Sequence, residues 1–170
     1  MPQAFYLDDD TKFEIGVDEV GRGPMFGRVY TAAVILPKEG FDYSLMKDSK
    51  KFTSEKKIRA AAEYIKENAL YWAITYEDEN VIDKINIRQA TFKSMHKSIA
   101  TILEQINGKW KKEDIFLLID GTDFKPYTKM IDDSLYVYKH ECVKGGDDEF
   151  ATISAASILA KVERDNYIIE

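Results

Sequence analysis

The chain has 170 residues, a length that suits one domain with a single apolar core. Hydrophobic residues make up 45% and charged residues 32% of the sequence, which is the balance of an ordinary globular protein. The net charge of −6 argues against a protein that coats nucleic acid nonspecifically, because such proteins are usually basic. An enzyme with a local cluster of carboxylates remains compatible with this charge.

The sequence also limits the setting in which we expect the chain to act. No apolar run approaches the roughly 20 residues of a membrane span, and the N-terminus lacks the regions of a signal peptide. Cys142 is the only cysteine, so no internal disulfide can form. We therefore expect an intracellular, cytoplasmic protein without membrane contact, in which Cys142 is a small buried residue rather than a nucleophile.

The first half of the chain predicts a β-hairpin, a helix and a third strand. Residues 13–20 alternate between apolar and polar and stop at a glycine-rich turn, as a strand does. Residues 28–36 are rich in β-branched and apolar side chains, so we expect them to pair with the first strand. Capping residues at 53–55 predict a helix that runs to about Asn68, and residues 70–76 predict the third strand.

The second half predicts a long helix, two further strands and a last helix. The long helix runs from Asn86 to about Ile106, with apolar residues on one side. Residues 115–119 are continuously apolar, which is typical of a strand buried on both faces. Residues 135–140 predict a short fifth strand, and Phe150 begins a helix rich in small residues. The order favours an α/β fold, a five-stranded mixed sheet flanked by helices.

Acidic residues stand beside glycines at two strand ends and one helix entry. Asp18 and Glu19 lie near the end of the first strand, Asp120 follows the apolar run, and Asp147 lies in a glycine loop. Neighbouring strand residues point to opposite faces, so Asp18 and Glu19 share a site only if the strand twists or ends there. Clustered carboxylates repel one another unless cations neutralise them, and an all-oxygen ligand set suits Mg²⁺ or Mn²⁺.

The other catalytic options in the sequence are few. His96 and His140 lack metal-ligand spacing, and we expect His96 to be a partly exposed helix residue without a catalytic role. There is no serine elbow and no Walker-type phosphate loop. Two cations about 4 Å apart would clamp the attacking and leaving oxygens of a phosphoryl displacement without any protein nucleophile. A metal-dependent phosphodiesterase is one interpretation among several, because 30 acidic residues make chance placement easy.

Four ordered blocks of the sequence resemble one family. Residues 16–27 closely resemble the opening signature of ribonuclease HII, a type 2 member of the ribonuclease H superfamily. Residues 48–51 resemble its second block and residues 119–121 its third. Residues 144–147 and 153–165 resemble its last block. The match runs from about Phe13 to the end of the chain.

The resemblance implies an endonuclease that cuts the RNA strand of RNA–DNA hybrids, or DNA at embedded ribonucleotides, with two divalent cations, Mg²⁺ or Mn²⁺. We expect a monomer. The residues that match the family's catalytic and metal-binding acids are Asp18, Glu19, Asp120 and Asp147. Those that match its substrate contacts are Gly21, Arg22 and Gly23, which read the ribose 2′-hydroxyl, and Ser49 and Lys50, near the phosphates. Only glycines let the main chain approach a sugar closely, and the 2′-hydroxyl distinguishes RNA from DNA.

Some positions keep two interpretations. Asp148 is the main rival of Asp147, and its other interpretation is a helix N-cap. Arg164 and Asp165 look structural, as an ion pair or a cap. Arg28 stands where the family usually has proline. The lysine-rich stretch at residues 47–59 is either a solvated loop and helix start or a phosphate contact.

The family usually continues with more helix and a tyrosine that stacks at the RNA–DNA junction, and Tyr167 lies too early to be that residue. We therefore expect a short lead, residues 1–12, and a catalytic domain, residues 13–170, without those C-terminal helices and with weaker junction specificity.

Three alternatives remain open from the sequence. Ribonuclease HIII shares the four acids but usually has an additional N-terminal domain. The other two are a hybrid-binding module that does not cleave, and a structural protein with coincidental motifs.

Overall fold

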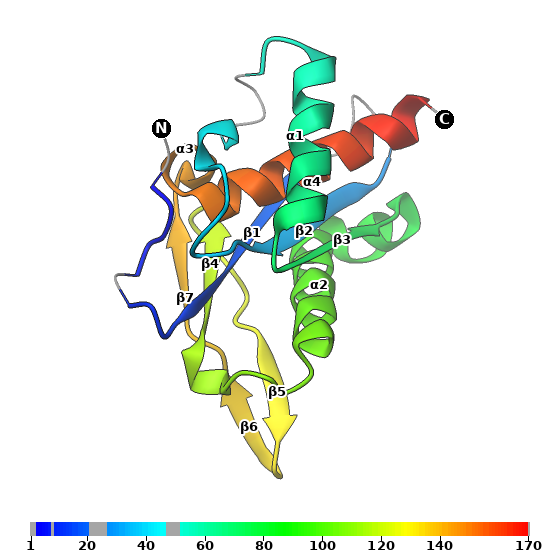
Figure 1. Cartoon of the computed structure of the whole chain (residues 1–170). Coiled ribbons are helices and arrows are strands. Elements are labelled where there is room, and N and C mark those ends of the chain that lie inside the picture. Colours follow the sequence, from blue (N-terminus) through cyan, green and yellow to red (C-terminus); the bar gives the residue numbers. More distant parts are fainter. Residues whose placement is uncertain (1–2, 8, 21–26, 47–51, 170) are drawn as a thin grey trace.

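The computed structural model describes residues 3–7, 9–20, 27–46 and 52–169, and it shows one five-stranded mixed sheet with helices on both faces (Figure 1). The strands of this sheet are β1 (Phe13–Val20), β2 (Val29–Ile35), β3 (Tyr71–Glu77), β4 (Ile115–Asp120) and β7 (His140–Val143). The α-helices are α1 (Glu55–Asn68), α2 (Glu79–Ile106), α3 (Gly146–Glu149) and α4 (Ala151–Ile169). Shorter elements are the 3₁₀ turns η1 (Tyr43–Leu45) and η3 (Lys112–Asp114) and the strands β5 (Thr128–Ile131) and β6 (Ser134–Val137).

The strand order in the sheet is β3-β2-β1-β4-β7. The pairs β1–β2 and β2–β3 are antiparallel, as expected for the predicted meander, whereas β1–β4 and β4–β7 are parallel. The predicted α/β fold with a five-stranded mixed sheet is therefore confirmed. Because β1 and β4 are parallel neighbours, their carboxyl ends lie at the same edge of the sheet.

Each face of the sheet has its own apolar core. Ile15 and Val17 of β1 pack in the core on the side of α2, whereas the core on the other side combines β2 with α1 and α4. Strand alternation then places Gly16 and Asp18 on the face of α4. The carboxyl group of Asp18 thus lies buried in the layer between the sheet and α4.

Helix α4 packs unusually close to β1. A Cβ atom built on Gly16 would lie 2.4 Å from the carbonyl carbon of Thr152, so only glycine fits at that crossing. The first turns of α4 carry small, fully buried residues, which permit this approach: Ala151, Thr152, Ser154, Ala155 and Ala156. The predicted run of small residues therefore serves close packing of the last helix on the first strand.

A group of four hydroxyls joins α2 to the sheet. Thr31 Oγ1 lies 2.7 Å from Ser94 Oγ and 3.0 Å from Ser98 Oγ. Thr75 Oγ1 lies 2.7 Å from Ser98 Oγ and donates to the Ser94 carbonyl, also at 2.7 Å. These polar groups are satisfied inside the core, so they fix the position of α2 on β2 and β3 without the cost of an unpaired donor.

Two expectations about the elements are wrong. The fifth strand of the main sheet is β7 at His140–Val143, whereas half of the predicted strand at 135–140, residues 135–137, lies in β6. Strands β5 and β6 form a separate two-stranded ribbon, whose two-residue turn holds Asp132 and Asp133 at φ of 51° and 64°. Helix α2 begins at Glu79, before the predicted start, and bends at Asn86, where φ is 75°. The predicted start at Asn86 therefore marks a kink, where Asn86 Oδ1 accepts from Gln89 N.

None of the described helices combines the length and the hydropathy that crossing a membrane requires.

Candidate active site

Two aspartates meet at the carboxyl ends of β1 and β4. The parallel register pairs Val17 with Ile119, so the next positions along the strands are Asp18 and Asp120. Both side chains lie on the face of the sheet that α4 covers, and the two carboxyl groups hydrogen-bond each other. The predicted meeting of these two residues at one sheet edge is thus observed.

The surroundings of Asp18 oppose its ionisation. Its residue surface is 2% exposed, and burial, the neighbouring charge and hydrogen bond of Asp120, and the charge of Asp147 together raise the pKa of Asp18 well above its usual value. The backbone N–H of Glu19 donates to Asp18 Oδ1 at 2.7 Å, which acts in the opposite direction. A cation bound between the two carboxyls would remove the repulsion that contributes to this raised pKa.

A glycine pair connects Asp120 to the last part of the chain. The backbone N–H of Gly146 donates to Asp120 Oδ1 at 2.8 Å. A Cβ atom on Gly146 would lie 2.5 Å from Ile153 Cδ1, and Gly145 has a φ of 66°, which favours glycine. The glycine loop therefore brings main chain against Asp120 and starts α3 beside it.

The structure separates Asp147 from its rival Asp148. Asp147 is half-buried and its charge acts on Asp18, whereas Asp148 is exposed. The N-cap of α3 is Gly145, and Asp148 lies within that helix with its N–H donating to the Gly145 carbonyl at 3.0 Å. Because the last helix, α4, begins at Ala151, Asp148 is not its N-cap, and the role of Asp147 as the third acid stays a prediction.

Glu19 follows Asp18 in β1. The register pairs Glu19 with Thr31, whose side chain faces α2, so strand alternation directs Glu19 to the face opposite Asp18. The role of Glu19 as the fourth acid stays a prediction.

The donor set fits a hard divalent cation. Asp18, Asp120 and Asp147 offer only carboxylate oxygens, the ligands that Mg²⁺ and Mn²⁺ prefer. Asp120 is close enough to raise the pKa of Asp18, so one ion could contact both carboxyls. Within the described residues, no group of three or more His, Cys, Asp or Glu side chains is already arranged as a ligand shell. The site is thus a candidate whose ligands need small movements to close on an ion.

The N-terminal lead supports α3, a contact that the sequence did not predict. The Gln3 N–H donates to the Glu149 carbonyl, and the Ala151 N–H donates to the Gln3 carbonyl, both at 2.7 Å. These bonds hold the junction of α3 and α4 and therefore the segment that carries Asp147. Backbone hydrogen bonds of this kind cannot be predicted from which residues are present.

The other residues with reactive side chains make contacts that suit a structural role. His96 Nε2 donates to the Lys125 carbonyl at 2.7 Å, and burial lowers the pKa of this half-buried imidazole. Cys142 is partly buried in β7, and burial raises the pKa of its thiol. Asp165 pairs with Lys161 at 2.5 Å and Arg164 at 3.2 Å, which confirms the predicted ion pair.

Comparison with known proteins gives the family. A family model described as Ribonuclease HII matches residues 15–170. The chain belongs to the ribonuclease HII family. The ribonuclease HII of Porphyromonas gingivalis is 40% identical over 164 residues, which cover 96% of this chain and 72% of the relative. That of Alteromonas mediterranea is 44% identical over 162 residues, which cover 93% of this chain and 73% of the relative. The resemblance noted in the sequence is thereby confirmed.

Solved structures share the fold. A mutant protein of Bst-RNase HIII matches with a TM-score of 0.71 at 20% identity, over 92% of this chain and 53% of that chain. This chain therefore spans about half the length of that protein. Ribonuclease HII in the PCNA:RNase HII complex from Archaeoglobus fulgidus matches with a TM-score of 0.63 at 22% identity, over 92% of this chain and 75% of that one. At these identities the matches show the fold alone.

Five residues that the resemblance to ribonuclease HII assigns to substrate contacts lie outside the described part of the chain. They are Gly21, Arg22, Gly23, Ser49 and Lys50. Their assignments stay predictions.

Proposed function

We propose that this chain is an endonuclease that hydrolyses the RNA strand of RNA–DNA hybrids, with divalent cations held by Asp18, Asp120, Asp147 and Glu19. Membership of the ribonuclease HII family supports the reaction class. The arrangement of Asp18, buried against Asp120 and beside Asp147, is the observation that carries the proposal. Such a cluster is unfavourable in an apolar layer unless positive charge binds there.

The protein groups have separate tasks in this reaction. Bound Mg²⁺ or Mn²⁺ would polarise the phosphodiester and activate the attacking water. Asp18 supplies a ligand fixed by burial and by the Glu19 N–H. Asp120, oriented by the Gly146 N–H, would be a second ligand. Asp147, on the short helix α3, would add a third carboxylate.

Mn²⁺ is the metal in one structural neighbour, described as Bst-RNase HIII in complex with Mn²⁺. Either Mg²⁺ or Mn²⁺ suits an all-carboxylate set, so we propose both as activating metals. The intracellular, cytoplasmic setting and the monomeric state stay predictions from the sequence.

Sequence similarity favours ribonuclease HII over ribonuclease HIII. The family model and the curated relatives at about 40% identity carry the HII name, whereas the HIII neighbours match at 20% and 21%. The effects of Asp120 and Asp147 on the pKa of Asp18 favour cleavage over a module that only binds hybrids. We include DNA with embedded ribonucleotides as a substrate, because the predicted Gly21-Arg22-Gly23 turn needs only a 2′-hydroxyl partner.

Cleavage of matched labelled duplexes tests the proposal. One duplex carries a long RNA tract, one carries a single embedded ribonucleotide, and one is DNA throughout. We expect Mg²⁺ or Mn²⁺ to support cleavage of the first two and chelator to abolish it, while the DNA duplex stays intact. Cleavage of the DNA duplex, or turnover in chelator, contradicts the proposal. The ratio of the first two rates measures the preference between a long RNA tract and a single embedded ribonucleotide.

A further inference from the structure

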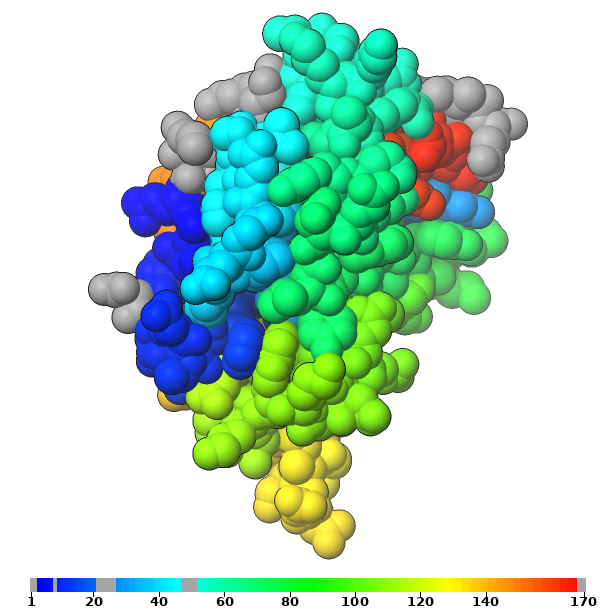
Figure 2. Space-filling view, in the orientation of Figure 1, coloured from blue at the N-terminus to red at the C-terminus, as the bar shows by residue number. Residues whose placement is uncertain are grey.

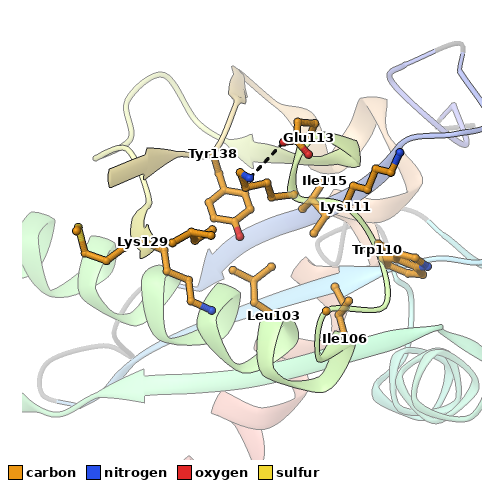
Figure 3. A pocket seen from close by; sticks show the side chains of 12 residues that line it. Leu103, Ile106, Trp110, Lys111, Glu113, Ile115, Lys129 and Tyr138 are labelled. Atoms are coloured by element: carbon orange, nitrogen blue, oxygen red, sulfur yellow. Dashed lines mark ion pairs between the residues drawn. The ribbon is translucent and has the colours of Figure 1, made fainter. Parts of the chain in front are cut away.

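A groove lies at the end of the molecule opposite the carboxylates. It has a volume of about 500 Å³, within the range of known ligand pockets, and lies between the end of α2, the segment before β4, and β5 (Figure 3). Ile115, the first residue of β4, lines it, whereas Asp120 is the last residue of that strand. At about 3.3 Å per residue, the groove lies roughly 16 Å from the candidate active site. A ligand there would leave the active site open.

The floor of the groove is apolar. Figure 3 shows Leu103 and Ile106 rising from α2, with Ile115 and Tyr138 on the opposite side. Ile131 of β5 and Trp110 also line it. This floor suits one large apolar side chain better than a sugar–phosphate backbone, which would leave phosphates against hydrocarbon.

The rim of the groove is cationic, although the chain as a whole carries a net charge of −6. Lys111, Lys112 and Lys129 line the groove, together with one acidic residue, Glu113. Glu113 pairs with Lys112 at 3.3 Å. Neither Lys111 nor Lys129 forms an ion pair within the described part of the chain. Two cations therefore remain available for acidic groups of a ligand.

The β5–β6 ribbon next to the groove exposes apolar side chains. Met130, Leu135 and Val137 are 62%, 61% and 51% exposed, the highest values among the large hydrophobic residues that the structure describes. The register pairs Met130 with Leu135 and Thr128 with Val137, so these side chains share one face. Figure 2 shows this part of the chain as a knob that projects from the body. Concentrated exposure of this kind marks interaction surfaces.

The ribbon also offers strand edges. Within the described residues, the sheet of β5 and β6 contains only those two strands, so their outer edges pair with no further strand. An extended peptide can add to such an edge through main-chain hydrogen bonds, while alternate side chains enter neighbouring pockets. Met130 and Lys129, adjacent residues of β5, both line the groove, and strand alternation directs their side chains to opposite faces of the ribbon, so an edge-bound peptide can contact both.

We propose that this groove and the β5–β6 ribbon bind an extended acidic segment of a partner protein, with one large apolar side chain in the groove. Lys111 and Lys129 bind the acidic groups, and the apolar floor takes the anchoring side chain. The contact tethers the chain to a partner without covering the active site. It is independent of the proposed cleavage activity.

Peptide binding tests this surface. The probes are short fluorescein-labelled peptides in which aspartate and glutamate surround one phenylalanine, leucine or tryptophan, and binding is followed by fluorescence anisotropy. We expect saturable binding that weakens as salt is raised, because the charges lie at the surface. Replacing the phenylalanine with alanine should weaken binding about 10- to 100-fold.

Protein variants locate the site. Lys111→Glu with Lys129→Glu should weaken binding about tenfold, because attraction becomes repulsion. Met130→Ser should weaken it several-fold. Lys84→Glu with Lys93→Glu makes the same charge change at exposed positions of α2 and should bind as the wild type does. Thermal melting confirms that each variant folds, since all these side chains are at the surface.

Several results would overturn the proposal. These are no saturable binding of any peptide, equal binding of the alanine peptide, and weaker binding by the Lys84/Lys93 variant but not by the Lys111/Lys129 variant. A groove that serves nucleic acid instead would show lost hybrid binding in the Lys111/Lys129 variant and no peptide binding. A groove that serves a second copy of the chain would show concentration-dependent dimers, lost in Met130→Ser, and no peptide binding.

Discussion

The two ends of β4 depart from the usual pattern of burial in opposite directions. At the carboxyl end, Asp120 hydrogen-bonds Asp18, a carboxyl group buried almost completely. At the amino end, the structure leaves Met130 and Leu135 of the adjoining ribbon in water. Charge in a dry layer and hydrocarbon in solvent both lower stability. Each departure marks a place where the chain serves binding rather than folding.

The largest expected effect is the loss of cleavage when a carboxylate at the first end is replaced. Asp120→Asn removes a proposed metal ligand while its amide oxygen can still accept from the Gly146 N–H. We expect the cleavage rate to fall by at least about 10³-fold, with hybrid binding retained. Single-turnover assays and anisotropy measure the two quantities.

Asp133→Asn is the matched control, because it makes the same chemical change in the turn of the β5–β6 ribbon, where asparagine also tolerates a positive φ. It should cleave at the wild-type rate. A folded Asp120→Asn variant with near-normal turnover would refute the role of Asp120.

The next effect concerns the close packing of α4 on β1, which supports the carboxyl end of β4. Gly16→Ala places a Cβ atom within 2.4 Å of the Thr152 backbone, which cannot yield as a flexible side chain would. We expect the free energy of unfolding to fall by about 1–3 kcal/mol in urea denaturation. A Cβ atom on Gly27 would have no neighbour within 4 Å, so Gly27→Ala should change the free energy of unfolding by less than about 0.5 kcal/mol. Equal stability of the two variants would show that α4 adjusts freely on β1.

A smaller, pH-dependent effect follows from the raised pKa of Asp18. In chelator, native Asp18 keeps its proton to higher pH than the unfolded chain, in which the pKa is near 3.8. The native state therefore binds more protons above that value, and the free energy of unfolding falls as pH rises. Asp18→Asn cannot ionise, so we expect it to be the more stable protein at neutral pH, with an advantage that shrinks toward pH 3.8.

Urea denaturation at several pH values measures this difference. Added Mg²⁺ should stabilise the wild type but not the variant, because binding to the native state adds stability. A wild-type protein that gains stability over Asp18→Asn as pH rises in chelator would contradict the assignment.

The smallest expected effect concerns the β5–β6 ribbon at the amino end of β4. Leu135→Thr keeps a strand-forming residue and removes exposed hydrocarbon, so the free energy of unfolding should change by less than about 0.5 kcal/mol. Cleavage should be unchanged, and binding of a fluorescent dye that detects apolar surface should decrease. A measurable loss of cleavage would show that the two ends of β4 are coupled.

The sequence predicted the carboxyl end of β4 better than the ribbon at its amino end. The apolar run at residues 115–119 predicted a buried strand, and Asp120 directly after it predicted a carboxylate at the end of that strand. The family signature then identified Asp18 and Asp147. What residue identity could not supply was the contact between Gly146 and Asp120, or the support that Gln3 gives to α3, since both are main-chain hydrogen bonds.

Strand β5 and the pairing of β5 with β6 were missed because these strands have no clear apolar pattern. Residues 128–131 and 134–137 expose most of their side chains, so the alternation that marks a half-buried strand is absent. Asp132-Asp133 was the available signal, because consecutive aspartates tolerate the two positive φ angles of a tight hairpin turn. The start of α2 was placed too late for a similar reason. Asn86 can cap a helix, and residues 79–85 are too few to show a helical period of apolar residues.

The parallel pairing of β1 with β4 has a consequence for how the protein is made. Phe13 pairs with Ile115, and Gly16 meets Thr152, so more than half of the chain separates each pair. Contacts of such long separation form late and slowly, and they require the intervening segments first. During synthesis Asp18 emerges early, and the proposed ion site is complete only once Asp120 and Asp147 have followed. We therefore expect cleavage only from a chain whose domain has finished folding.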